Sequence, residues 1–236
     1  MSCFFYISFH FITTAELSAI LLSLKVALLS TLISFPVALY FGWIMARSHF
    51  KGKSIIEGII HFPLVMPPVT TGYLLLILLG TQGVIGSWLY KSFGIRLAFN
   101  QAAAIIAAMV VSFPLATRSI RTSIEMVDRR FEDASRTLGV SYFQTFFRVT
   151  FPLALPGIIS GLVLGFARCL GEFGATITFA GNIQGETQTI PLAVYSLMQV
   201  PGKEGATLRL VIFSAIISLL AMIFAEYLNK KVKKKR

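Results

Sequence analysis

The stretch Val127–Gly157, VDRRFEDASRTLGVSYFQTFFRVTFPLALPG, is a polar island between strongly apolar segments. An apolar stripe runs along its first part with the spacing i, i+4, i+7 and i+11, which places the residues on one face of a helix. Gly139 follows at once, where a residue in the left-handed region most easily ends a helix. The sequence therefore predicts a short amphipathic helix. The residues of its apolar stripe are Val127, Phe131, Ala134 and Leu138.

A second short helix is predicted directly after that glycine. Ser141 stands three residues before Gln144, the spacing of a capping box. Four aromatic residues follow Ser141 closely, and Pro152 and Pro156 are expected to limit the length of the helix. Two short helices joined at a glycine form a shape suited to docking on a partner. An amphipathic pair lying on the bilayer surface is the alternative.

The spacing within this stretch resembles the EAA loop of ABC importer permeases. That loop reads Glu-Ala-Ala, three residues, Gly, nine residues, Ile, any residue, Leu-Pro, and here Asp133, Ser135, Val149 and Phe151 replace four of its positions. The resemblance implies a cytoplasmic coupling helix, Val127 to Leu138, that seats in a groove of a separate ATPase subunit. The implied coupling residues are Asp133, Ala134, Ser135, Gly139, Phe143 and Pro152.

The composition is that of an integral membrane protein. Of the 236 residues, 56% are apolar and the mean hydropathy is +0.77, which excludes an ordinary soluble domain. The net charge of +11 would suit nucleic-acid binding, but the basic residues lie in clusters beside apolar segments, as the positive-inside rule predicts. We therefore expect contact with membrane lipid and none with nucleic acid.

Five apolar segments predict an all-α polytopic bundle of about five transmembrane helices, with room for a sixth. An N-terminal extension (1–16) precedes them, a coupling loop (125–152) lies between the third and the fourth, and a basic tail (229–236) follows the last. The predicted spans are 17–46, 55–80, 101–119, 156–180 and 208–228.

The distribution of Lys and Arg predicts the orientation of the chain. With five spans, fifteen of these residues fall on the side of the coupling loop, counting Arg118 at the end of its span, and four fall on the opposite side, counting Arg209 at the start of its span. The other two, Lys25 and Arg168, lie within spans. The side with the excess is expected to be cytoplasmic. The N-terminus is then outside and the C-terminus inside.

Two polar, glycine-rich regions interrupt the predicted spans. The first, residues 62–73, contains Pro63, Pro67 and Pro68, which must bend or break the second span, and the second is residues 165–195. Neutral donors near broken helices would hold an anion weakly enough for transit. For a single threonine, a hydrogen bond to its own helix is the more ordinary role. The candidate pathway residues are Thr70, Thr71, Ser112, Arg168, Glu172, Thr176 and Asn182.

Some membrane residues have two interpretations. Arg168 and Glu172 stand four apart, so a structural ion pair on one helix is expected, with an anion contact by Arg168 as the alternative. Lys25 could contact substrate but is expected to snorkel to the headgroups. Glycines at every fourth position, Gly157, Gly161 and Gly165, could line a contact within the chain or a seam between two copies.

No pattern for catalysis, a metal or a cofactor is evident. Cys3 and Cys169 are far apart, the three histidines lack ligand spacing, and there is no glycine loop for nucleotide phosphates. An intramembrane enzyme would need clustered ionisable residues, whereas those in the spans are scattered. A stand-alone channel is a further alternative and should conduct without nucleotide. We expect no catalytic site and no cofactor in this chain.

A closer resemblance rests on two longer stretches. FPLVMPPVTTGYLLLILLG (Phe62–Gly80) and GEFGATITFAGNIQGETQTIPLAVY (Gly171–Tyr195) resemble the molybdate permeases of bacterial ABC importers, and the likeness extends over about Leu17–Leu228. It implies the type I importer permease fold, the bacterial inner membrane, pairing with a second copy, and import of molybdate and its near isostere tungstate. It also implies a cytoplasmic ATPase dimer that binds ATP and magnesium, and a periplasmic oxyanion-binding protein. A sulfate or thiosulfate permease is the alternative.

Overall fold

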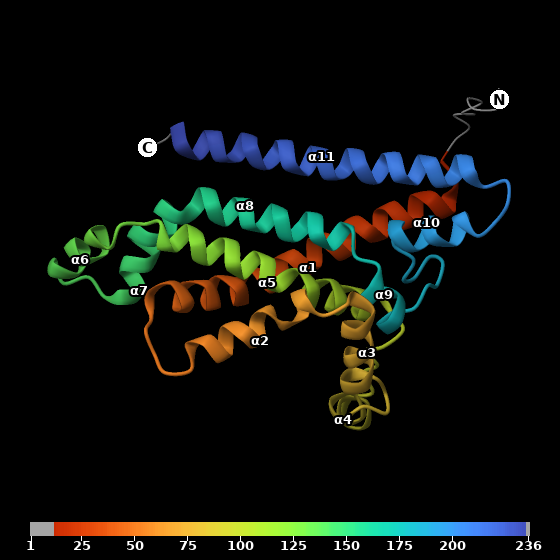
Figure 1. Cartoon of the computed structure of the whole chain (residues 1–236), viewed down its shortest axis with the longest axis horizontal. Helices are drawn as coiled ribbons and strands as arrows, with labels where there is room; N and C mark the ends of the chain where they lie inside the picture. The colour runs from red at the N-terminus through yellow and green to blue at the C-terminus, as the bar shows by residue number, and fades with distance from the viewer. Residues whose placement is uncertain (1–11, 235–236) are drawn as a thin grey trace.

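The computed structural model describes residues 12–234, and helices account for its regular structure. The predictions for residues 1–11 and 235–236 lie outside the described residues. Figure 1 shows the arrangement along the chain. The helices are α1 (Thr14–Arg47), α2 (Lys53–Val65), α3 (Pro68–Leu79), α4 (Val84–Phe93), α5 (Gln101–Glu125), α6 (Arg129–Thr137), α7 (Tyr142–Thr145), the π-helical turn η1 (Phe146–Thr150), α8 (Phe151–Leu170), α9 (Gly174–Phe179), α10 (Ile190–Met198) and α11 (Glu204–Lys234).

Four long helices, α1, α5, α8 and α11, run roughly side by side. The helices α6 and α7 lie at one end of this bundle, together with the end of α11, and α10 lies at the other end (Figure 1). Within residues 12–234, four helical segments are long and apolar enough to cross a membrane, and the pair α2–α3 makes a fifth if it counts as one span. This agrees with the prediction of about five spans.

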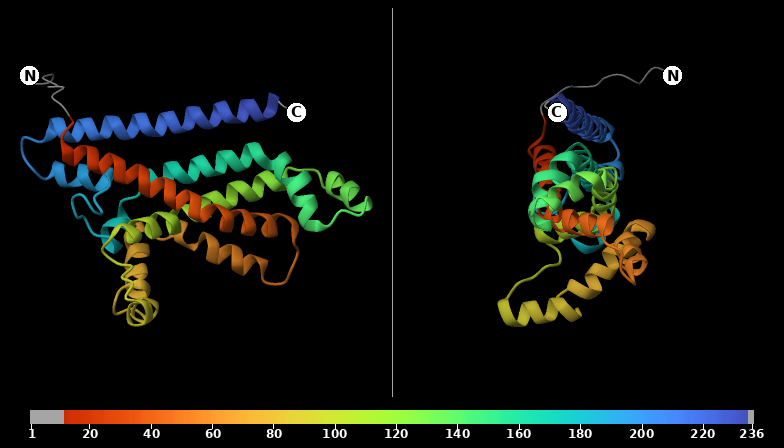
Figure 2. Two further views of the ribbon diagram at one scale, coloured as in Figure 1. Left: turned by 180° about the vertical axis from the view of Figure 1, so that it is seen from behind. Right: turned by 90° about the vertical axis from the view of Figure 1, so that its left-hand side faces the viewer.

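The predicted break in the second span is sharp. The axes of α2 and α3 differ in direction by 113°, and the break falls at Met66–Pro67 between them. Seen along the bundle in the right-hand view of Figure 2, α3 and α4 extend away from the long helices. The short helix α4 follows α3 closely in the chain.

Small side chains allow the central helices to approach closely. The buried core between α1, α5 and α8 includes Ala103, Ala104, Ala107 and Ala108 of α5, each at most 1% exposed. Large apolar side chains instead cover the outside, as on α11, where Leu220 is 60% exposed. In soluble proteins the large apolar side chains are buried; here they lie outside, as expected for a surface in contact with lipid.

The row of glycines on α8 faces α5 of the same chain. A Cβ at Gly161 would lie 2.9 Å from the Cβ of Ser119, and a Cβ at Gly157 would collide with the side chain of Ser123. Of the two predicted roles for this row, the structure thus supports contact within the chain.

The helices α1, α5 and α11 each extend beyond the predicted span. α1 begins at Thr14, earlier than Leu17, because Thr13 and Glu16 form a capping box. α5 continues past residue 119 to Glu125, and α11 continues into the predicted basic tail as far as Lys234. In each case polar residues extend a helix that the apolar pattern alone would end.

The prediction that Pro152 and Pro156 stop the second short helix was wrong. α7 leads through η1 into α8 as one helical segment, Tyr142–Leu170. At the join, the Phe151 N–H donates to the carbonyl of Phe146, five residues back. This wider turn accommodates Pro152, which has no N–H to give to a regular helix.

The predicted fourth span, 156–180, is not one helix. α8 ends at Leu170, and α9 begins at Gly174. Residues 171–173 therefore interrupt the span, so that it contains a break as the second span does.

At the α10 end, a buried ion pair joins the first long helix to the last. Arg209 of α11 lies 2.8 Å from a carboxylate oxygen of Glu16, whose residue is 5% exposed. The other carboxylate oxygen accepts from the N–H of Thr13. The carboxylate of Glu16 therefore fixes the start of α1 and holds α11 beside it.

Candidate functional site

The two-helix segment at the end of the bundle has the predicted geometry. Asp128 caps α6 by accepting from the N–H of Arg130 at 2.9 Å, and Ser141 caps α7 by accepting from the N–H of Gln144 at 3.4 Å. Gly139 between them has φ of +79°, so the predicted left-handed corner is confirmed.

The predicted apolar stripe of α6 faces away from the bundle. Val127, just before the helix, is buried, but Phe131 is 58% exposed and Leu138 is 83% exposed. Ala134 and Asp133 are also exposed. An apolar face left open beyond the end of the bundle is typical of a surface that a partner covers.

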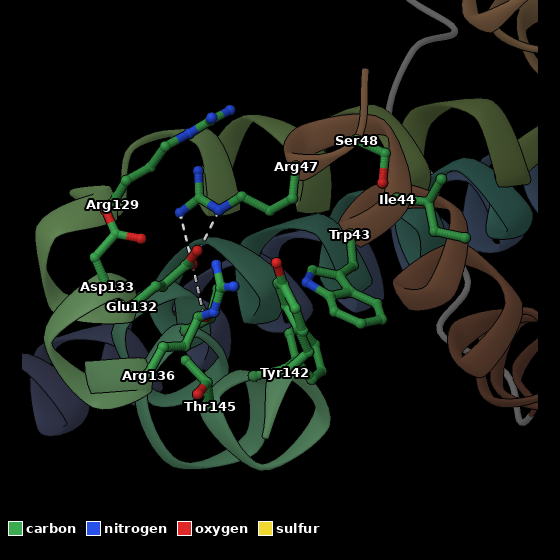
Figure 3. A pocket seen from close by; sticks show the side chains of 12 residues that line it. Trp43, Ile44, Arg47, Ser48, Arg129, Glu132, Asp133, Arg136, Tyr142 and Thr145 are labelled. Atoms are coloured by element: carbon green, nitrogen blue, oxygen red, sulfur yellow. Dashed lines mark hydrogen bonds and ion pairs between the residues drawn. The ribbon is translucent and has the colours of Figure 1, made fainter. Parts of the chain in front are cut away.

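The inward face of α6 is polar, and Glu132 lies at its centre. One carboxylate oxygen of Glu132 accepts from Arg47 Nε at 2.9 Å and from Thr150 Oγ1 at 2.7 Å, and Arg47 Nη2 lies 2.8 Å from the same oxygen. Arg47 also donates to the carbonyl of Val127 at 2.8 Å. Figure 3 shows the Arg47 guanidinium directed at Glu132. Glu132 is not among the predicted coupling residues, because nothing in the sequence relates it to an arginine 85 residues away.

A pocket of about 540 Å³ lies between the end of α1 and the α6–α7 pair. Arg136 of α6 stacks over the ring of Tyr142 at 3.8 Å, and Ser135 is 3.2 Å from Thr145, oxygen to oxygen. Asp133 also lines the pocket. The coupling candidates Asp133 and Ser135 therefore lie on different sides of α6, the first exposed and the second bonded to the next helix.

An aromatic cluster anchors α7. Phe146 is 4% exposed, and its ring lies 4.8 Å from Trp43 and 5.0 Å from Phe147, centroid to centroid. Phe143 packs against Phe147 at 4.8 Å but remains 66% exposed. Pro152, the last coupling candidate, is exposed near the start of α8. α7 is thus held at Phe146 and presents Phe143 outward.

The two glycine-rich regions meet where α3 packs on α9. A Cβ at Gly72 would lie 2.6 Å from the carbonyl oxygen of Ala175, and a Cβ at Gly174 would lie 2.8 Å from Pro68 Cβ. Among the pathway candidates, Thr71 on α3 and Thr176 on α9 are buried at this end of each helix, whereas Thr70 is exposed.

The remaining neutral candidates, Ser112 and Asn182, lie in other elements of the chain. Ser112 is buried in α5 and donates to the carbonyl of Met109 at 3.3 Å, and Thr71 donates to the carbonyl of Pro67 at 3.4 Å. Asn182 is exposed in the connection before α10 and donates to Ser196 at 2.7 Å. The hydroxyls of Ser112 and Thr71 thus bond to nearby carbonyls, and a pathway role for these residues stays a prediction.

Arg168 and Glu172 form the predicted ion pair, at 2.8 Å, with side chains 30% and 2% exposed. The prediction that both lie on one helix was wrong, because α8 ends at Leu170 and Glu172 lies in the break before α9. There it also accepts from the N–H of Ala175 at 2.8 Å. The pair therefore bridges the break.

The Lys25 side chain has a partner on another helix. Lys25 donates to the side-chain oxygen of Gln101 at 2.9 Å, which ties α1 to the start of α5. Within residues 12–234, no three His, Cys, Asp or Glu side chains come close enough together to hold a metal ion.

Comparison with known proteins gives a consistent result. Residues 38–234 match the family described as binding-protein-dependent transport system inner membrane component. The molybdenum transport system permease protein ModB of Haemophilus influenzae is 54% identical over 93% of this chain and 96% of its own length, and ModB of Escherichia coli K12 is 50% identical over the same shares. A probable sulfate transport system permease protein, cysT of Chlorokybus atmophyticus, is 32% identical over 91% of this chain and 75% of its own length.

Two solved structures share the fold. One is an inward-facing MetNI methionine ABC transporter, whose matched chain has a TM-score of 0.74 at 16% identity and covers 92% of this chain and 95% of its own. The other is a bacterial alginate ABC transporter in complex with an alginate pentasaccharide-bound periplasmic protein. Its matched chain has a TM-score of 0.76 at 19% identity, and the match covers 94% of this chain and 81% of that chain.

Proposed function

The chain belongs to the family of binding-protein-dependent transport system inner membrane components, and from this premise we propose that it is the permease subunit of an ABC importer for molybdate. The observation that carries the proposal is the 50–54% identity to two molybdenum permeases over 93% of the chain. Identity to a sulfate permease is lower, 32%, which makes sulfate the weaker alternative.

The proposed complex contains two copies of this chain, a cytoplasmic ATPase dimer and a periplasmic binding protein. ATP and magnesium bind the ATPase, and this chain supplies no catalytic group. The end of the bundle that carries α6 and α7 lies in the cytoplasm, and the N-terminus lies outside. The excess of Lys and Arg on the α6 side supports this orientation.

In this complex the α6–α7 pair is the contact with the ATPase. The exposed residues Phe131, Leu138 and Phe143 seat in the groove of the ATPase, where their apolar surface is removed from water. The corner at Gly139 sets the angle between the two helices. When ATP binding closes the ATPase dimer, α6 moves with it and the bundle changes from inward-facing to outward-facing.

Molybdate then passes between broken helices. As a dianion it would be trapped by a cluster of fixed cations, so neutral donors suit its passage better. The α3–α9 contact brings the two interrupted spans together and supplies Thr71 and Thr176. The Arg168 charge is balanced by Glu172 and is not available as a free cation.

Reconstitution tests the proposal. The chain is purified with its ATPase and binding protein in liposomes, and uptake is measured with molybdate, tungstate and sulfate in turn. We expect ATP-dependent uptake of molybdate and tungstate that requires the binding protein. Uptake of sulfate in preference to molybdate would support the alternative permease, and passage without ATP would identify a channel.

A further inference from the structure

Glu132 joins three parts of the chain that are far apart in sequence. It belongs to α6, Arg47 is the last residue of α1, and Thr150 ends η1 just before α8. The Arg47 and Glu132 side chains are 13% and 16% exposed, and Thr150 is 1% exposed. One carboxylate thus connects the candidate coupling helix to two long membrane helices.

Within residues 12–234, the hydrogen bonds and ion pairs between the α6 side chains and α1 all end on Glu132. The other polar contacts of α6, Ser135 with Thr145 and Arg136 with Tyr142, reach only α7, the neighbouring helix across the Gly139 corner. A displacement of α6 can therefore pass to α7 in several ways but to α1 chiefly through Glu132.

The chemistry of this contact suits transmission of movement. A guanidinium that donates to a carboxylate and to a backbone carbonyl is held in direction as well as in distance. Arg47 holds the Glu132 side chain and the Val127 carbonyl, one within α6 and one just before it, so the start of α6 and the end of α1 are constrained together. Coupling between sites requires a contiguous physical contact of this kind.

From these contacts we infer that Glu132 is a positioning residue that carries the movement of α6 to α1 and α8 during transport. The inference rests on the proposed function, since it needs an ATPase that moves α6. It differs from docking on the ATPase, because Glu132 points toward the bundle and the docking residues point away.

The test uses the full complex with its ATPase and binding protein in liposomes and measures molybdate uptake per ATP hydrolysed. Glu132→Gln keeps the shape of the side chain and removes its charge. We expect uptake per ATP to fall by about tenfold or more, the change that loss of one charge-assisted hydrogen bond produces in an equilibrium. The amount of ATPase that co-purifies with the chain should not change.

Two further variants connect this effect to the pair. Arg47→Met should have a similar effect, and combining it with Glu132→Gln should add little, because both remove the same interaction. Glu125→Gln is the matched control. Glu125 is ion-paired to Arg121 at 2.7 Å near the same end of the bundle but lies outside α6, so uptake per ATP should remain that of the unaltered chain.

The outcomes are distinct. Unchanged uptake per ATP in Glu132→Gln, or equal losses of uptake and of bound ATPase, would overturn the inference. If Glu132→Gln does not fold, Arg47→Lys is used instead. Lysine keeps the positive charge but lacks the guanidinium that donates both to Glu132 and to the Val127 carbonyl, and normal uptake per ATP in this variant would also overturn the inference. Failure of the unaltered complex to import molybdate would instead count against the proposed function.

Discussion

At the residue scale, the corner at Gly139 is explained by backbone geometry alone. Its φ of +79° lies in the left-handed region, and a Cβ placed there would meet nothing within 4 Å. The requirement for glycine is therefore conformational, and crowding plays no part in it. This corner was predictable from the sequence, because a glycine directly after an amphipathic helix is a local signal.

Substitution of Gly139 should distinguish side chains by their tolerance of this conformation. Gly139→Val should greatly reduce molybdate uptake while the chain still inserts in the membrane. The left-handed conformation destabilises a residue other than glycine by about 1–2 kcal/mol, and β-branched residues tolerate it least. Gly139→Asn should retain more uptake, since asparagine tolerates positive φ. Uptake in liposomes and the amount of chain in the membrane are measured together. Uptake by Gly139→Val equal to that of the unaltered chain would show that the corner is unimportant.

The ion pair at the break before α9 gives a second prediction at this scale. Arg168→Ala leaves the buried Glu172 carboxylate without its counter-charge, and breaking a buried pair in this way costs about 3–5 kcal/mol. The double variant Arg168→Ala with Glu172→Gln removes the unpaired charge and keeps an acceptor for the Ala175 N–H. We expect the double variant to take up more molybdate than the single one. A double variant that is worse would favour direct contact of Arg168 with the anion.

At the element scale, the sequence predicted which segments are helical better than how they join. The break at Pro67 was predictable because proline acts locally. The passage through Pro152 was not, because it depends on the π-helical turn that places the Phe151 N–H against Phe146. The stripe of α6 was predictable as a pattern, but its outward direction was not, since that depends on Glu132 and an arginine from α1.

The contact between α3 and α9 supplies the prediction at this scale. Gly72→Val should force the two helices apart, because even a Cβ there would lie 2.6 Å from the Ala175 carbonyl oxygen, and overpacking of this kind costs about 1–3 kcal/mol. Thermal unfolding in detergent should begin at a lower temperature, and uptake should fall. Gly58→Val on α2, where a Cβ would meet nothing within 4 Å, is the control and should unfold like the unaltered chain.

At the scale of the whole molecule, composition and the apolar segments predicted the class of protein and an all-α bundle of about five spans, and the resemblance to molybdate permeases implied the type I importer fold. The class of protein and the number of spans could be predicted because the thickness of the bilayer sets the length that an apolar segment needs to cross it. Sequence alone could not indicate that the two glycine-rich regions meet at α3 and α9, because the residues involved are about a hundred positions apart and share no local signal. The site was therefore predictable as separate parts, and their arrangement was not.

The orientation of the molecule can be tested by labelling. In a chain with Cys3 and Cys169 replaced by serine, a cysteine is introduced at Thr137, at the α6 end, or at Gln184, in the connection before α10; both positions are exposed. A membrane-impermeant maleimide should label Gln184→Cys in cells with an intact inner membrane, and Thr137→Cys only after that membrane is permeabilised. The reverse pattern would place α6 outside and contradict the proposed coupling to a cytoplasmic ATPase.

The ion pair between Glu16 and Arg209 has a consequence for how the protein is made. Its two members are 193 residues apart, so the acid leaves the ribosome long before the base that neutralises it. Until the last helix is inserted, the Glu16 carboxylate lacks its counter-charge and keeps only the hydrogen bond from the Thr13 N–H. The contact between α1 and α11 at this end can form only after Arg209 has been synthesised, so this end of the bundle is the last to close.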